Sequence, residues 1–225
     1  MAIDDFTFQA IWEAKVPNGE ILCLGYPDIL VHAEITGVGE HPDADRIRGW
    51  HGWNGRVYEA SEVFSKMGLR ATYLDIVRSR GPESIHDLNE PLAADLAGRF
   101  DIVLDPGTTE HCFNVGQAFR NVRDAAKPGG IIIHENPLSM VNHGFWNINP
   151  GTYHDFYDQD TVHLCAEVYG EVNKKKIETI RKPYARFTPR DNASILVVVE
   201  KGAGPTIWPQ QRKYRHNPQL LAPAA

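Results

Sequence analysis

FDIVLD at 100–105, VGQAFRNVRDAAK at 115–127 and PGGIII at 128–133 form the stretch of sequence that decides the fold. The first segment predicts a buried strand over Phe100–Leu104. In the second, apolar residues recur at helical spacing, which predicts a helix over 115–127 with Asn114 as its N-cap. The third predicts another buried strand over Ile131–Ile133. A strand, a helix and a strand in this order indicate a parallel sheet covered by helices.

The rest of the chain continues this alternation of short apolar runs and helical segments. The predicted elements, in order, are a helix over Phe6–Lys15, a strand over Glu20–Leu24, a helix over Glu59–Met67, a strand over Arg70–Ile76, an extended piece over Ser84–Asn89, a weak helix over Pro91–Ala97, a helix or strand over Thr161–Val172 and a strand over Ser194–Val199. We therefore expect one domain over residues 1–202. Residues 31–57 are expected to form a loop-rich insertion, and residues 203–225 a C-terminal arm or disordered tail.

The composition argues against several classes of protein. The 225 residues carry 23 Lys and Arg against 29 Asp and Glu, a formal net charge of −6, which argues against general binding to nucleic-acid phosphates. No apolar run approaches the roughly 18 residues of a membrane span, and the start of the chain lacks an export signal. The three cysteines form no CxxC, so neither a disulfide framework nor a thiolate zinc site is expected. These features predict a soluble, cytoplasmic protein.

The stretch at 100–133 resembles class I S-adenosylmethionine-dependent methyltransferases. FDIVLD is similar to the fourth strand of that family, Glu110-His111 to the pair that follows it, and KPGGIII at 127–133 to its turn into the fifth strand. Residues 142–145, Asn-His-Gly-Phe, also resemble one branch of uncharacterised bacterial members. The resemblance covers roughly residues 18–200. It implies an α/β, Rossmann-like fold with a mostly parallel seven-stranded sheet, helices on both faces, and S-adenosylmethionine bound across the carboxyl ends of the strands.

The resemblance also implies which residues hold the cofactor. Asp75, at the end of a predicted strand, would accept hydrogen bonds from both ribose hydroxyls. Asp87 and Leu88 would contact the adenine. The turn with Asp105, Gly107 and Thr108 would face the methionine part. The alternative for the carboxylates is an ordinary role as solvated loop groups or as turn residues.

The first turn departs from the family, which usually carries two or three glycines after an acidic residue. Leu24, Gly25 and Tyr26 stand at this turn and complete the candidate cofactor-binding residues, with Gly25 as the single glycine. Glycine lets a backbone approach a ligand without a Cβ in the way, and Tyr26 with Pro27 is expected to stiffen and fill that space. The cofactor site is therefore expected to be tighter or reshaped, with its loss as the alternative.

Glu110 and His111 follow the central strand and are candidate catalytic residues. A histidine acts as a general base near neutral pH, and a neighbouring carboxylate orients it or raises its pKa. Non-catalytic roles stay open for both residues: Glu110 favours the start of the next helix through the helix dipole, and His111 lines the cofactor or has a structural role. His143 and His154, in a later aromatic segment, are the remaining catalytic candidates.

Residues 142–157 concentrate aromatic, histidine and asparagine side chains. We interpret residues 137–160 as a substrate lid that is mobile and only partly buried without acceptor. The candidate substrate-binding residues are Trp146, Asn147, Tyr153 and Tyr157. The alternative is that these aromatics only pack against one another.

The histidines give no sign of a metal site in the sequence. His143, His154 and His163 follow one another at intervals that include no HxH or HExxH, so no pair falls on one face of a helix. Residues 37–39, Gly-Val-Gly, lack the third glycine of a dinucleotide fingerprint. We therefore expect neither a metal nor a nicotinamide cofactor.

These features predict a methyltransferase that acts on a small-molecule acceptor such as a sugar, an amino acid or a secondary metabolite. Methyl transfer from a sulfonium is an in-line displacement in which positioning does most of the catalysis, with a histidine as general base. One alternative keeps the cofactor but uses it for cyclisation, elimination or lyase chemistry. Another is a non-catalytic partner subunit that docks through Trp50, Trp53 and Trp208, and a homo-oligomer also stays open.

Overall fold

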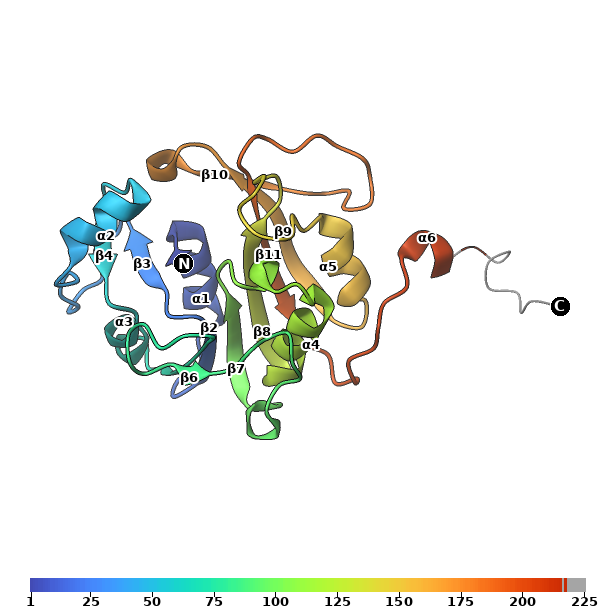
Figure 1. The fold of residues 1–225 in the computed structure, drawn as a ribbon, viewed down its shortest axis with the longest axis horizontal. Helices are drawn as coiled ribbons and strands as arrows, with labels where there is room; N and C mark the ends of the chain where they lie inside the picture. The colour runs from blue at the N-terminus through green and yellow to red at the C-terminus, as the bar shows by residue number, and fades with distance from the viewer. Residues whose placement is uncertain (216, 218–225) are drawn as a thin grey trace.

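Alternating burial along the central strands divides the protein into two hydrophobic layers. In β2 (Glu20–Leu24), Ile21 and Cys23 belong to one core, and Leu22 and Leu24 to the other. The strands β7 (Phe100–Asp105) and β8 (Ala126–Pro137) alternate in the same way. The structure is a computed structural model that describes residues 1–215 and 217. Its central sheet lies between helices (Figure 1), with an apolar core on each face.

The central sheet has eight strands in the order β10-β9-β11-β8-β7-β2-β5-β6. The other strands are β5 (Arg70–Asp75), β6 (Ser84–Ile85), β9 (Thr161–Tyr169), β10 (Lys176–Thr179) and β11 (Ser194–Glu200). From β6 to β8 all pairings are parallel, and the strand order reverses between β2 and β7, which defines a doubly wound, Rossmann-like sheet. The predicted fold is confirmed, with an eighth strand because β10 pairs antiparallel with β9. The segment Thr161–Val172, for which the sequence allows helix or strand, is the strand β9 with the start of a short turn.

Helices cover both faces of this sheet (Figure 1). The helices α1 (Asp5–Ala14) and α3 (Ala60–Lys66) pack on one face, through Ile11, Val63 and Phe64. The helices α4 (Val115–Ala125) and α5 (Pro150–Phe156) pack on the other. Single 3-10 turns span Ala94–Leu96, Thr109–His111 and Val172–Lys174. Asn114 is the N-cap of α4, as predicted, since its side chain accepts from Gln117 N at 3.4 Å. Across the part of the chain that is described, no helix has both the length and the apolar character that a membrane crossing requires.

The region 31–57 is more ordered than the expected loop-rich insertion. The strands β1 (Ala2–Ile3), β3 (Asp28–Val31) and β4 (Arg56–Tyr58) form a second, three-stranded sheet, and α2 (Ala44–His51) packs against it. Its small core contains Ile47 and Trp53, which is only 6% exposed. The glycines that suggested a loop include the C-cap of α2, Gly52, which has φ +61°.

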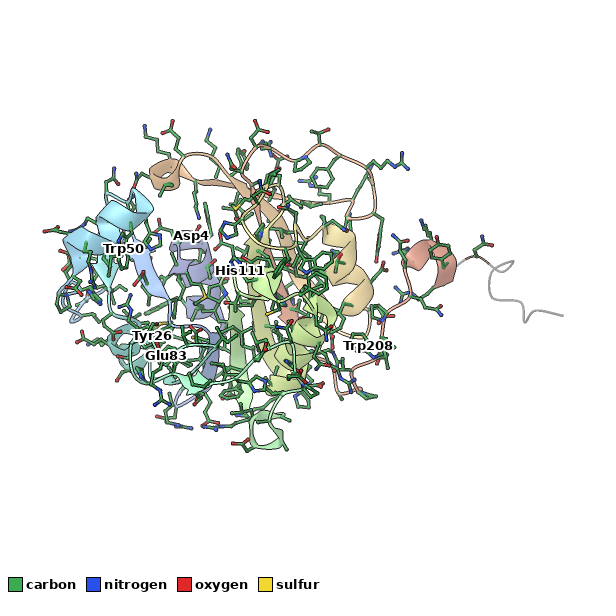
Figure 2. The ribbon with its side chains drawn as sticks, viewed as in Figure 1. Asp4, Tyr26, Trp50, Glu83, His111 and Trp208 are labelled. Carbon is green, nitrogen blue, oxygen red and sulfur yellow. The ribbon has the colours of Figure 1, made fainter. Side chains whose placement is uncertain are left out.

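The three tryptophans that could dock a partner subunit do not share one surface. Trp53 is buried in the small core, while Trp50 and Trp208 are 66% and 57% exposed. Figure 2 shows Trp50 and Trp208 on opposite sides of the molecule, so they cannot form a single docking face.

The segment after residue 202 is fastened to the domain as far as it is described. The guanidinium of Arg123 in α4 donates to both carboxylate oxygens of Asp160 at 2.7 and 2.8 Å, to the carbonyl of Gly204 at 3.1 Å and to Thr206 at 2.9 Å. Further along, α6 (Arg212–Arg215) is held by Asp155, which accepts from the backbone of Arg212. The expected arm is therefore partly docked, and residues 216 and 218–225 lie outside the described residues.

Replacing Arg123 should show how much its bonds to Asp160 and to residues 204–206 contribute to stability. The side chains of Arg123 and Asp160 are 3% and 0% exposed, so Arg123→Ala leaves a buried carboxylate without its cation. We expect the free energy of unfolding, measured by chemical denaturation, to fall by about 3–5 kcal/mol, and residues 203–215 to become sensitive to protease. The control is Arg46→Ala, which removes an exposed ion pair and should cost less than about 1 kcal/mol. Equal denaturation midpoints for the two variants would contradict the anchor.

Candidate active site

The carboxyl ends of three neighbouring parallel strands meet where the strand order reverses. β2 ends at Leu24, β5 at Asp75 and β7 at Asp105. Gly25 follows β2 with φ +81°, and a Cβ at Gly25 would lie 3.6 Å from Oδ2 of Asp75. In doubly wound sheets ligands bind at this switch point, so the edge beside Gly25 is the candidate cofactor site.

The space beside Gly25 fits a methionine side chain. The side chain of Met1 lies there, and a Cβ on Gly25 would fall 1.6 Å from its Cε. Thr108 Oγ1 lies 2.8 Å from the sulfur of Met1 and donates to the carbonyl of Leu24 at 2.8 Å. The residues around this space therefore leave room for a thioether side chain, and only glycine at position 25 does so.

Tyr26 does not fill this space, contrary to the expectation from the sequence. Its hydroxyl donates to Glu59, and its ring stacks on Tyr73 with 4.2 Å between the centroids. Burial and the hydrogen bond to Glu59 raise the pKa of Tyr26 to about 12. Tyr26 thus belongs to the layer around α3 rather than to the candidate cofactor site.

The residues predicted to contact ribose and adenine follow one another along the sheet edge. Asp75 is half-buried, and its Oδ1 accepts from Val77 N at 3.2 Å. His86 N donates to the carbonyl of Asp75 at 2.9 Å, which brings the segment with Asp87 and Leu88 beside it. Asp87 is exposed and its Oδ1 accepts from the backbone and side chain of Asn89, which lowers the pKa of Asp87, whereas Leu88 is buried. The ribose and adenine contacts stay predictions.

Asp105 anchors a buried network instead of facing the cofactor. Its side chain is fully buried, and Oδ1 accepts from the backbone N–H groups of Thr108 and Thr109 at 3.0 and 3.1 Å. Oδ2 accepts from His134 Nδ1 at 2.7 Å, from Thr109 Oγ1 at 2.7 Å and from Asn136 Nδ2 at 3.0 Å. Burial by itself raises the pKa of Asp105, but the hydrogen bond and charge of His134 outweigh it and hold the pKa below its usual range. We therefore correct its predicted role from cofactor contact to anchor of the turn at 106–109, which includes the predicted Gly107 and Thr108.

Two polar residues of the network, His134 and Asn136, are not among the residues predicted from the sequence. Both lie in β8 and are buried, on the face where Ile132 enters the core. Asn136 Nδ2 also donates to Oε2 of Glu110 at 3.0 Å, while the hydroxyl of Tyr157 lies 2.7 Å from Nε2 of His134, within hydrogen-bond distance. The signal that could have found them is the two-residue period that continues from Ile132 to these polar side chains.

Tyr153 and Tyr157 support this network from α5 and from the residue after it. They are 0% and 1% exposed, and the hydroxyl of Tyr153 donates to Oδ1 of Asn136. Burial raises the pKa of both hydroxyls well above the usual value. Their predicted contact with substrate is therefore wrong for this structure, because both hydroxyls are engaged inside the core. The predicted lid accordingly divides into a buried helix and an exposed loop at 141–147.

Three of the four candidate catalytic residues come together at the end of this network. The Glu110 side chain is fully buried, and its Oε1 lies 3.7 Å from His111 Nε2 and 3.6 Å from His143 Nε2. The two histidine side chains are about half exposed, with 5.4 Å between the ring centroids. Burial and the charge of Asp105 raise the pKa of Glu110 to about 8, while burial and the charge of His143 lower the pKa of His111.

The exposed loop reaches this cluster through Gly144. A Cβ on Gly144 would lie 2.9 Å from Cγ and from the carbonyl oxygen of Glu110, and Phe145 N donates to that carbonyl at 2.9 Å. Asn147 Oδ1 accepts from Met140 N at 2.8 Å and closes the loop, and its predicted contact with substrate stays a prediction. Trp146 donates to the carbonyl of Cys112 at 3.1 Å and remains 39% exposed.

An exposed aromatic wall stands next to the histidines. Phe113 is 72% exposed. The centroid of its ring lies 5.5 Å from the ring centroid of Phe145 and 6.1 Å from that of Trp146. Figure 2 shows His111 near the middle of the molecule. His154, in contrast, packs 6.0 Å from the ring of Tyr184 in a separate pocket that Arg212 also lines, so it does not join the other catalytic candidates.

Neither a family model nor a curated protein matches the chain. Among solved structures, the chain is similar to the MccD protein at 13% identity and a TM-score of 0.49, over 86% of this chain and 95% of that one. It is similar to 1,6-didemethyltoxoflavin-N1-methyltransferase from Burkholderia thailandensis, solved with bound S-adenosylhomocysteine, at 13% identity and a TM-score of 0.42, over 87% of this chain and 76% of that one.

A protein described as a Zn-dependent alcohol dehydrogenase from Rhodobacter sphaeroides also aligns, at 14% identity and a TM-score of 0.40, over 61% of this chain. The chain spans about half of that protein, namely 48% of its length. Proteins described as methyltransferases are thus among the solved structures to which the chain is similar.

Substituting Gly144 should detach the loop from Glu110. In Gly144→Ala the new methyl group overlaps the backbone of Glu110, and we expect the free energy of unfolding to fall by about 1–3 kcal/mol. The side-chain NMR signals of His143 should shift as its imidazole leaves Glu110. Gly39→Ala is the matched control, because nothing lies within 4 Å of a Cβ there, and it should change stability by less than about 0.5 kcal/mol. A stable Gly144→Ala with unshifted His143 signals would show that the close approach is not needed.

Proposed function

We propose that the protein is an S-adenosylmethionine-dependent methyltransferase that acts on a small-molecule acceptor. The observation that carries the proposal is the space beside Gly25, which accommodates a thioether side chain within reach of Asp75 and Thr108. A hydrogen bond links this space to the histidines: the backbone N–H of His111 donates to the carbonyl of Thr108 at 3.0 Å. Cofactor and acceptor would thus occupy adjoining positions.

Each group of residues has a part in this function. Gly25 admits the methionine part, Asp75 accepts from the ribose hydroxyls, and Thr108 closes the space on the β7 side. Bound S-adenosylmethionine supplies an electrophilic methyl group on a sulfonium. The exposed rings of Phe113 and Phe145 hold a flat, partly apolar acceptor and exclude water from it.

The proton of the acceptor is taken at the histidine pair. Either imidazole accepts a proton from a hydroxyl or amine near neutral pH. Glu110 lies 3.6–3.7 Å from both rings and stabilises the resulting positive charge where its carboxyl group is ionised, which is favoured as the pH approaches and passes its pKa of about 8. His154 has no part in this step, because it lies in a separate pocket.

Two variants should separate cofactor binding from turnover. Asp75→Ala removes a charged acceptor, worth about 1.5–3 kcal/mol, so calorimetric titration with S-adenosylhomocysteine should show roughly tenfold or greater loss of affinity. His143→Ala should leave that affinity within a few-fold and reduce the transfer of labelled methyl to acceptor. His163→Ala, an exposed histidine bonded to Glu200, is the control and should behave as the unchanged protein. No binding to folded protein at millimolar ligand would overturn the proposed function.

Met1 should compete with the cofactor for the space beside Gly25. A chain that begins at Ala2 lacks the thioether in that space. Its apparent affinity for the cofactor should exceed that of the full chain by a factor of 1/f, where f is the fraction of time for which Met1 leaves the space open in the full chain. The gain is about tenfold if Met1 fills the space for about nine-tenths of the time. Calorimetry on both forms measures it, and equal affinities would show that Met1 does not block the site.

A further inference from the structure

The carboxylate of Glu110 has an oxygen for which the rest of the cluster provides no donor. Oε2 accepts from Asn136, whereas Oε1 is buried and has no hydrogen-bond partner within residues 1–215. Leaving a buried carboxylate oxygen unpaired costs free energy, and a bound ion is one of the ways in which a native protein meets that cost. Oε1 faces the Nε2 atoms of His111 and His143.

We propose that Glu110, His111 and His143 form a binding site for a divalent first-row transition metal of the zinc type. The three side chains each offer one ligand atom, and these atoms all lie within 4.8 Å of one another. Two imidazoles and one carboxylate are a ligand set that zinc and its first-row neighbours accept, whereas magnesium and calcium prefer oxygen alone.

The spacing is close to that of a metal-bound set. With zinc bonds of about 2.0–2.2 Å, neighbouring ligand atoms in a tetrahedral site lie about 3.4 Å apart. The two separations from Oε1 are 3.7 and 3.6 Å, within a few tenths of an ångström of this spacing. The ligand atoms of the two imidazoles lie within 4.8 Å of one another, so ion binding would draw the two half-exposed rings together. The half-exposed histidines leave the outer side open for water or for an acceptor oxygen.

The surroundings hold these ligands in place. Glu110 is oriented by Asn136, which in turn is bonded to Asp105 and Tyr153. Hydrogen-bonded partners of this kind orient ligands and strengthen metal binding in known metal sites. His143 is brought to Glu110 by the close approach of Gly144. The order of residues could not show this site, because a helix and a strand separate His111 from His143.

A metal at this site would select the acceptor. It favours a small molecule with a hydroxyl group that coordinates the ion, because coordination makes loss of the hydroxyl proton easier and the proton then passes to solvent. The histidines would then be ligands rather than the base. This consequence rests on the proposed function, whereas metal binding does not.

Metal binding is tested on the untagged full chain after treatment with a chelator. Titration with Zn²⁺ by calorimetry, and with Co²⁺ by visible absorption, should show one equivalent bound per chain with ligand-field bands of a nitrogen- and oxygen-ligated ion. Glu110→Gln, His111→Ala and His143→Ala should each weaken binding by about 100-fold or more. His154→Ala and His163→Ala are the matched controls and should bind as the unchanged protein. Circular dichroism identifies any variant that fails to fold, and the exposed position of His143 makes His143→Ala the most robust of the three.

Absence of binding at millimolar Zn²⁺ and Co²⁺, or binding that survives all three ligand substitutions, would overturn the metal site. A parallel titration with S-adenosylhomocysteine keeps the two proposals apart. Metal binding without cofactor binding removes the methyltransferase and keeps the metal site, and the reverse result removes only the metal site.

Discussion

The buried carboxylate of Asp105 is the interaction on which the candidate active site depends. It is fully excluded from solvent, and such a charge is tolerated only when hydrogen bonds replace its water. Two backbone N–H groups, a threonine hydroxyl, an amide and an imidazole do so. These donors come from the turn after β7 and from β8, so satisfying one charge fixes the conformation of the turn that carries Glu110 and His111.

The same network accounts for the gathering of reactive groups at one place on the surface. The side-chain amide of Asn136 donates to both Asp105 and Glu110 and so fixes their relative positions. The hydroxyl of Tyr153 in α5 donates to Asn136 and holds it in place. Glu110 is consequently buried and held by Asn136, while the two histidines beside it stay half-exposed. A rigid buried acid with half-exposed polar groups above it is an arrangement that positions a ligand with little loss of entropy.

The sequence could predict those features that depend on local pattern. The apolar runs of β2, β7 and β8 and the helical period of α4 identify the sheet, and strand ends locate Gly25 and Asp75. Features that depend on contacts between distant segments could not be predicted. The number of aromatic residues in a segment does not indicate that Tyr157 is buried and Trp146 exposed. The strands at 28–31 and 56–58 are too short for the two-residue alternation of a strand to be recognised in the sequence. His134 and Asn136 acquire their meaning only when β7 lies beside β8.

The first turn has a single glycine, and the packing of Tyr26 explains why further glycines are not needed there. A glycine-rich turn keeps side chains away from a ligand along its whole length. In this protein Glu59 and Tyr73 draw the side chain of Tyr26 toward α3, and only position 25 is left facing the switch point. A single glycine is then enough to keep this space open, because the ring of Tyr26 packs against Tyr73 and does not enter the space. The thioether of Met1 lies in that space, so the turn with one glycine leaves room for a methionine side chain.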